Sequence, residues 1–199
     1  RAEFFAILQQ IIVYPPSGEA PVVFADVTES DWFYGIFQSL IAAGMVEPIE
    51  GFVDPNRPLT RQEEAFFLAK AFNIPPVADE TAFADDGDIG AWSKGYVKAL
   101  NELGIIKGYE TEEGQMFRPS NSITRAEAVV IIELVAQNLI NAPGEYSDNV
   151  EGALVINCSG VKLTGMTVSG DLYLTGGAAD TILDNVSISG ELIVLNAGS

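Results

Sequence analysis

Positive charge is scarce in this sequence, and histidine is absent. The 199 residues carry 10 Lys and Arg against 28 Asp and Glu, so the formal net charge is −18. This balance excludes an ordinary nucleic-acid binder, because nucleic-acid affinity comes from cations that contact phosphates. It also disfavours docking on anionic lipid. We therefore predict that neither nucleic acid nor a lipid surface is a partner.

The sequence also has a single cysteine, no transmembrane run and no signal peptide. One cysteine cannot form an internal disulfide, so Cys158 is expected to be a small, buried apolar residue. Without a run long enough to cross a bilayer, we predict no membrane insertion. The lack of a signal peptide carries little weight, because the chain is expected to be a fragment of a longer protein.

Catalytic and metal-binding constellations are equally scarce. No Ser, His and Cys constellation for nucleophilic catalysis exists in the chain. The acidic cluster at residues 85–88 invites a calcium interpretation, but the alternating ligand pattern and a Glu at the right distance are missing. We therefore predict no catalytic residue, no metal ion and no cofactor.

What the sequence does contain is a repeated string. Residues 60–63 read Thr-Arg-Gln-Glu, and residues 124–127 read Thr-Arg-Ala-Glu. In each string the Thr is expected to cap a helix and the Glu to reach back to it, which makes a capping box. The predicted structural caps are Thr60, Glu63, Thr124 and Glu127. A third copy, Arg1-Ala2-Glu3, opens the chain without its Thr, so the first unit is expected to be truncated.

The arginine of the string has no such local explanation. A cation in the first helical turn lies at the positive end of the helix dipole, where it costs a few tenths of a kcal/mol. Three copies carry it, at Arg1, Arg61 and Arg125. The repeated arginine therefore predicts a function for a guanidinium at this position.

The repeat extends over units of about 60 residues, each with two predicted helices. Phe24-Ala25-Asp26 matches Phe83-Ala84-Asp85, and Trp32 matches Trp92 at the start of the first helix. The second helix starts at the capping box and is apolar nearly all round, which predicts burial. Its apolar residues are Phe5, Ile7, Leu8 and Ile11; Ala65, Phe67, Leu68 and Ala71; and Val129, Ile131, Ile132 and Val135. We expect these three helices to meet at the centre of a threefold-like bundle.

These motifs resemble the S-layer homology family over roughly residues 1 to 141. The family pattern runs from a Phe-x-Asp-Val start, through a Trp and a Gly-Tyr turn, to Phe-x-Pro and Ile-Thr-Arg-Ala-Glu. The third unit carries almost all of it, including Gly108-Tyr109 and residues 123–127. The second unit departs from it, because Gln62 replaces the Ala and Glu50-Gly51-Phe52 stands at the Gly-Tyr turn.

The resemblance implies anchoring to a bacterial cell wall, through grooves between repeats that bind secondary cell-wall polysaccharide with a pyruvyl ketal, or a peptidoglycan-linked glycan. A guanidinium fork suits the ketal carboxylate, and free N–H groups at the same helix start would add a second anion-binding element. An indole suits the C–H face of a sugar. By this carry-over the binding residues are Arg125, Arg61, Arg1, Trp32 and Trp92.

A structural interpretation stays open for each of these residues. The arginines could pair with a neighbouring repeat's carboxylate and hold the bundle together, and the Trp residues could be packing residues. Asp26 and Asp85 are expected to be turn or capping residues. Thr60 and the other caps are expected to be structural.

The composition changes after Leu139, and a second repeat appears. Residues 162–174 align with residues 182–194 at an offset of 20, and residues 152–156 precede their counterpart at Gly170 by 18. Short alternating strands at this period predict coils of a right-handed parallel β-helix. The expected interior residues are Val168, Leu172, Leu174, Ile188, Leu192 and Val194.

The predicted fold class is therefore α+β multidomain, with an all-α three-repeat bundle followed by a parallel β-helix segment. The expected parts are a partial first repeat at 1–20, repeats at 21–78 and 79–142, and the β-helix from 145 to 199. The favoured function is a non-catalytic wall anchor of an extracellular surface-layer protein. The alternatives are an anchored polysaccharide-degrading β-helix enzyme and a module that self-associates in a surface lattice without binding sugar.

Overall fold

The computed structural model describes residues 1–12, 14, 21–72, 74, 76–78, 80–102, 104–135, 138–174 and 177–194. The remaining residues include the end of the expected first repeat and the last five of the chain, and both lie outside the described residues. The chain divides into two compact units, one made of residue 1 with 56–134 and the other of 2–55 with 135–199. We describe each unit by itself.

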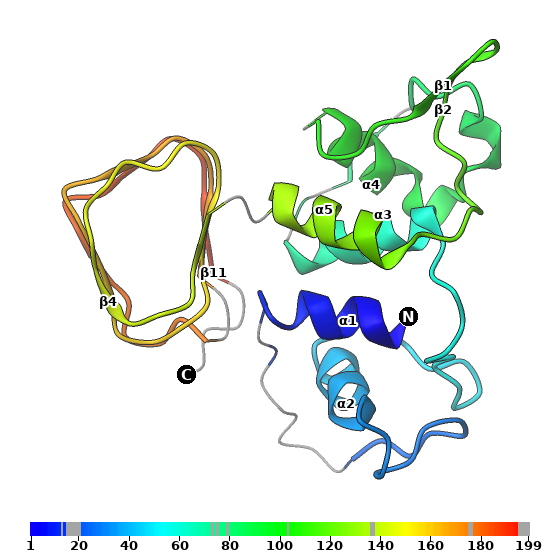
Figure 1. The fold of residues 1–199 in the computed structure, drawn as a ribbon, viewed down its shortest axis with the longest axis horizontal. Helices are drawn as coiled ribbons and strands as arrows, with labels where there is room; N and C mark the ends of the chain where they lie inside the picture. Colours follow the sequence, from blue (N-terminus) through cyan, green and yellow to red (C-terminus); the bar gives the residue numbers. More distant parts are fainter. Residues whose placement is uncertain are drawn as a thin grey trace. The chain divides into compact units, whose positions relative to one another are not determined.

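Five α-helices are found in the described part of the chain, at the positions that the repeat predicted (Figure 1). The Trp-led helices are α2, Tyr34–Ala42, and α4, Ala91–Glu102; the helices at the repeated string are α1, Ala2–Leu8, α3, Arg61–Ala71, and α5, Arg125–Val135. A short 3-10 turn, Asp86–Asp88, precedes α4. None of these helices is both long and apolar enough to cross a membrane.

Helix α3 is buried on most of its circumference, as its apolar residues predicted. Ala65, Leu68 and Ala69 have no exposed surface, and Phe67 is 7% exposed. It packs on α4, where Phe66 makes edge contacts with Trp92 and Tyr96 at ring-centroid distances of 5.2 and 5.3 Å. These contacts join the middle of α3 to the first half of α4 within one unit.

The burial expected around α5 is only partly correct. Its residues Ile131, Ile132 and Val135 are buried, but Val129 is 42% exposed. Val130 and Leu134 are also exposed, at 54% and 40%. The apolar sequence of α5 therefore does not mean burial on every side, because no described segment covers this face.

The C-terminal part winds as a parallel β-solenoid of about three turns. Its first face is the sheet of β3, Asn138–Ile140, β5, Leu154–Ile156, β8, Leu172–Leu174, and β11, Leu192–Val194. The second is β4, Gly144–Tyr146, β6, Val161–Thr164, and β9, Ile182–Asp184; the third is β7, Thr167–Val168, with β10, Ser187–Ile188. Figure 1 shows these coils nearly end on as a roughly triangular outline.

The strand register confirms both offsets read from the sequence. Leu154 pairs with Leu172, which is the shorter offset, and Leu172 pairs with Leu192, which is the longer one. The solenoid also begins earlier than residue 145, because β3 lies within the range expected for the third repeat and pairs in parallel with β5. Inward-facing Leu and Ile residues make its core, and Cys158 packs partly buried against it.

The interior prediction was wrong for two residues of the last coil. Val168 and Leu172 have no exposed surface, as expected, but Leu192 and Val194 are 47% and 56% exposed. Both lie on β11, at the edge of its sheet, where no further described strand pairs with it. A solenoid coil is buried only by its neighbours, so the same side chain is core in one coil and surface in the next.

Candidate functional site

Both predicted capping boxes are present. At α3 the Thr60 N–H donates to Glu63 Oε2 at 2.9 Å, and the Glu63 N–H approaches Thr60 Oγ1 at 3.4 Å. At α5 the corresponding distances, for Thr124 and Glu127, are 2.8 and 3.2 Å. The repeated Thr and Glu therefore fix where these helices begin, which sets the position of the arginine that follows each Thr.

Arg61 is buried, and its guanidinium is largely engaged. Nε donates to the Phe117 carbonyl at 2.9 Å, Nη2 to the Lys107 carbonyl at 3.2 Å, and Nη1 to the Tyr109 hydroxyl at 3.2 Å. The Tyr109 hydroxyl in turn lies 3.3 Å from Glu127 Oε1. Three of the five guanidinium N–H donors are thus used within this unit. Arg61 joins α3 to the loop and the capping box of the next repeat.

The N–H groups at the start of α3 are not free, contrary to expectation. Arg61 N donates to the Asn121 carbonyl at 2.9 Å, and Gln62 N donates to the Pro119 carbonyl at 3.1 Å. The loop that precedes α5 therefore supplies acceptors to the start of α3. An incoming anion would have to displace these carbonyls.

Arg1 also contacts the next capping box. Its Nη1 lies 3.0 Å from Glu63 Oε1, and its guanidinium lies over the Phe67 ring at 5.6 Å. Burial opposes ionisation of Glu63, but hydrogen bonds from Arg57 and Thr60 outweigh it and lower the Glu63 pKa to about 2. Arg1 thus makes the carboxylate contact of the structural interpretation left open by the sequence, whereas Arg61 links the repeats through two carbonyls and a hydroxyl.

Arg125 differs from both. Its side chain is exposed, and within the described part of the chain it makes no hydrogen bond or ion pair. The N–H groups of Arg125 and Ala126 likewise meet no acceptor among the described residues. The start of α5 thus presents a guanidinium and two backbone donors together.

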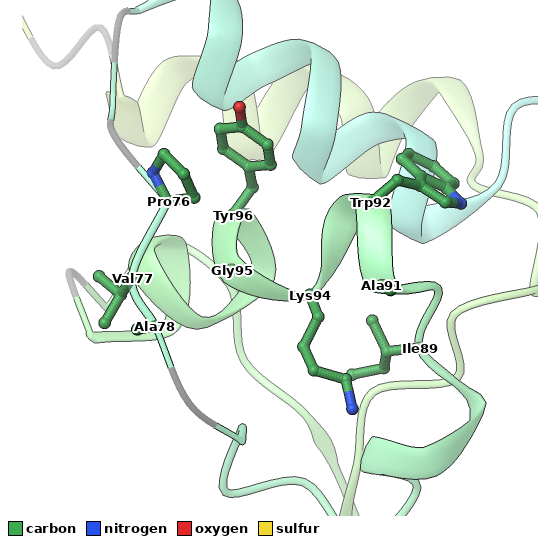
Figure 2. Close-up of a pocket in the computed structure, with 9 residues that line it drawn as sticks. All are labelled: Pro76, Val77, Ala78, Ile89, Ala91, Trp92, Lys94, Gly95 and Tyr96. Atoms are coloured by element: carbon green, nitrogen blue, oxygen red, sulfur yellow. The ribbon is translucent and has the colours of Figure 1, made fainter.

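The two tryptophans are exposed at the starts of their helices. Trp32 is 63% exposed and makes an edge contact with Phe33 at 5.1 Å. Trp92 is 50% exposed and lines a hollow of about 440 Å³ between residues 76–78 and the first turns of α4. Figure 2 shows Trp92 and Tyr96 directed toward α3, with Lys94 on the opposite side. Lys94 Nζ pairs with Asp86 Oδ2 at 2.6 Å.

Comparison with known proteins follows the same segments. Residues 23–64 and 82–129 match the family model of the S-layer homology domain. These two segments belong to the S-layer homology family. Each runs from the Phe-Ala-Asp string to the first turns of the helix at the capping box, so the repeated arginines at 61 and 125 lie inside the matched segments.

The relatives that carry similar sequence are much longer proteins. The chain is 28% identical over 158 residues to the Surface-layer 125 kDa protein of Lysinibacillus sphaericus, covering 79% of this chain and 13% of that protein. It is 31% identical over 140 residues to an amylopullulanase of Thermoanaerobacterium thermosulfurigenes, covering 66% of this chain and 7% of that protein. A cellulosome-anchoring protein of Acetivibrio thermocellus is 31% identical over 116 residues, covering 56% of this chain and 25% of that protein.

The S-layer homology segments and the surface-layer relatives identify this chain as part of a cell-surface protein. The surface-layer, enzyme and anchoring relatives share sequence with this chain over a small part of their own length. The name of one of them describes anchoring. The S-layer homology segments therefore indicate anchoring at the cell surface.

Two residues of the first matched segment, 23–64, were not predicted as site residues. Gln62 and Glu64 stand where the third copy has Ala126 and Ala128. Glu64 is 1% exposed, and its Oε1 has no hydrogen-bond partner among the described residues. Burial raises its pKa to about 7, while Arg61 opposes the shift and Glu127 adds to it. The sequence does contain a signal for them, because polar residues replace the two Ala residues of the third copy at these positions.

Proposed function

We propose that this chain is a non-catalytic wall anchor that binds a carboxylate-bearing wall glycan, of the pyruvylated secondary cell-wall polysaccharide type, chiefly at the start of α5. The observation that carries the proposal is the exposed guanidinium of Arg125, which has no protein partner among the described residues. It lies in an S-layer homology segment. A guanidinium fork and backbone N–H groups at one helix start together suit a carboxylate.

Arg61 and Arg1 are secondary ligand-binding residues in this proposal. Arg61 keeps two N–H donors without a protein acceptor among the described residues, but it is only 6% exposed. Arg1 is already paired with Glu63. A charge-assisted hydrogen bond contributes about 1.5–3 kcal/mol, so one site binds modestly, and several sites on one chain gain from effective concentration.

The three-repeat bundle belongs to the same proposal. At the start of α1, Ala2 N donates to the Pro55 carbonyl, and at the start of α3, Gln62 N donates to the Pro119 carbonyl, which occupies the equivalent place in the next unit. The starts of α1 and α3 are therefore each closed by the loop that precedes the helix of the following repeat. In a closed bundle of three repeats, a loop would close the start of α5 in the same way. A ligand or a further loop would therefore enter at the start of α5.

The enzymatic alternative gains no support from the solenoid acids. Asp171 Oδ1 accepts the Glu191 N–H at 2.8 Å, and Lys162 lies 3.0 Å from Glu145 and 3.7 Å from Asp184. These side chains tie neighbouring coils to one another.

The test is binding to purified wall polymer, before and after removal of its acidic ketal. We expect the ketal to strengthen binding by wild type, and Arg125→Ala to remove most of that gain. Arg125→Lys should keep part of it, because it retains the charge and loses the fork. Arg61→Ala should have a smaller effect, and Lys162→Ala, which removes a cation from the solenoid, should bind as wild type. Equal binding of both polymers by all variants would contradict the carboxylate mechanism.

A further inference from the structure

The side chain of Gln62 reaches from α3 to the start of α4. Its Oε1 accepts the Gly90 N–H at 3.0 Å and lies 3.3 Å from the Ser93 hydroxyl. Ser93 is fully buried, and its hydroxyl also lies 3.1 Å from the Gly90 carbonyl. Only the oxygen of an amide side chain can accept from an N–H, so the contact with Gly90 fixes the orientation of the amide. The Ala126 of the third copy is too short to make such a link.

Gln62, Gly90 and Trp92 are packed as one group. A Cβ added to Gly90 would lie 2.6 Å from Trp92 Nε1 and 3.2 Å from Gln62 Oε1. Phe66, one turn after Gln62 on α3, makes the edge contact that supports the Trp92 ring. The glycine therefore lets the indole and the amide approach the same point of the backbone, while half of the indole stays exposed.

The amide changes which groups this surface offers to a ligand. At the start of α4 the Gly90 N–H and the Ser93 hydroxyl meet a neutral oxygen, so a carboxylate that bound these two donors would have to displace it. The Nε2 group of Gln62 has no hydrogen bond among the described residues and is not among their buried unpartnered atoms. Its two N–H donors carry no net charge and lie on the side chain that packs beside Trp92.

We propose that Gln62 is a specificity-determining residue that adapts the α3–α4 surface to an uncharged sugar of the wall glycan. Its amide N–H donates to a sugar hydroxyl or acetamido oxygen, and the exposed part of Trp92 packs on the C–H face of the ring. The chain then holds two unlike subsites, an acidic-group subsite at Arg125 and a neutral-sugar subsite at Gln62. This inference rests on the proposed function, because it takes the wall glycan as the ligand.

The experiment uses the full chain with Arg125→Ala, so that the second subsite is measured apart from the first. The probe is the wall polymer after removal of its acidic ketal. Both Gln62→Ala and Gln62→Glu should weaken its binding by about threefold to tenfold, the loss of one neutral hydrogen bond. Gln115→Ala removes another amide side chain, which bonds Glu110 within the hairpin of β1, Tyr109–Thr111, and β2, Gly114–Met116, and should bind as the parent.

The Glu variant separates donation from support of the helix start. A carboxylate at position 62 can still accept the Gly90 N–H but cannot donate to a sugar at neutral pH. Hydrogen exchange of the Gly90 amide should therefore stay slow in Gln62→Glu and become faster in Gln62→Ala, whereas both lose sugar binding. If Gln62→Glu binds the neutral polymer as the parent does, the donor role is overturned.

The remaining outcomes also decide the question. If wild type binds the acidic polymer through Arg125 while both Gln62 variants keep full binding of the neutral polymer, this inference fails and the proposed function stands. If wild type binds neither polymer, the proposed function fails, and the neutral-sugar subsite fails with it.

Discussion

At the scale of single residues, two aspartates hold loops in a backbone conformation that side chains rarely adopt. Asp85 accepts the N–H groups of Phe117 and Arg118, each at 2.7 Å, and Asp26 accepts those of Val53 and Asp54 at 3.1 and 2.7 Å. Arg118 and Asp54 have φ of 59° and 48°. A carboxylate that accepts two N–H groups offsets this strain. These aspartates were expected to be turn or capping residues, and the loop that each one holds lies 27 to 33 residues away.

The buried Glu64 predicts how stability changes with pH. Its pKa is raised to about 7, against an ordinary value of 4.5. Between these two pH values the native state keeps a proton that the unfolded chain has lost, so the free energy of unfolding falls as pH rises. The full decline is up to about 3 kcal/mol. Glu64→Gln should remove it, so the variant is more stable than wild type at pH 8 and gains nothing from this cause at pH 4.5 or below.

The measurement is urea unfolding at pH 4.5, 6 and 8, followed by Trp92 fluorescence in a Trp32→Phe background. Glu133→Gln, which changes an exposed carboxyl on α5, is the matched control and should keep the wild-type profile. A Glu64→Gln profile that declines with pH as steeply as wild type would show that another group is responsible.

At the scale of helices and strands, glycines decide how closely the solenoid coils can stack. Gly170 N donates to the Gly152 carbonyl at 3.0 Å, and Gly190 N donates to the Gly170 carbonyl at 3.1 Å. A Cβ on Gly170 would lie 2.5 Å from Gly152 C and 2.7 Å from its oxygen. Backbone atoms cannot move aside as a flexible side chain can. The stacked position of Gly152, Gly170 and Gly190 therefore requires glycine, and the sequence repeat aligns these glycines.

Gly170→Ala should therefore destabilise the solenoid by about 1–3 kcal/mol, the usual cost of overpacking. Gly35→Ala is the matched control, because a Cβ there meets nothing within 4 Å and the residue lies in α2. That control should be neutral or stabilise by about 0.5–1 kcal/mol, since alanine favours helix. Hydrogen exchange of the β8 amides reports on the solenoid in both variants. Unchanged exchange in Gly170→Ala would contradict the stacking argument.

At the scale of the whole molecule, the net charge of −18 acts against an acidic ligand. Long-range repulsion between the chain and an anionic polymer is screened over about 10 Å at 0.1 M salt, while a direct contact between a guanidinium and a carboxylate is screened less. Affinity for the acidic polymer should therefore rise modestly from about 0.01 to 0.15 M salt. Titrations at these two ionic strengths, with the ketal-free polymer as control, test this. A steep fall with salt would indicate instead that many cations bind the polymer.

The sequence alone determined the helices, the capping boxes and the solenoid register. Each depends on residues close together in the chain or on a repeat that aligns with itself. The Thr and Glu of a capping box lie within one helical turn, and Leu154, Leu172 and Leu192 keep their offsets of 18 and 20 in the structure. The S-layer homology segments could be recognised for the same reason, since their motifs occur in order along the chain.

Only the tertiary structure decided what the repeated arginine contacts. Arg61 donates to a carbonyl 56 residues away, Arg1 pairs with a carboxylate 62 residues away, and Arg125 has no partner in the described part of the chain. The same string thus has three surroundings, because the loop of a following repeat closes the starts of α1 and α3, whereas no described loop closes the start of α5. Neighbours of this kind depend on packing between repeats, and no local pattern in the sequence contains them.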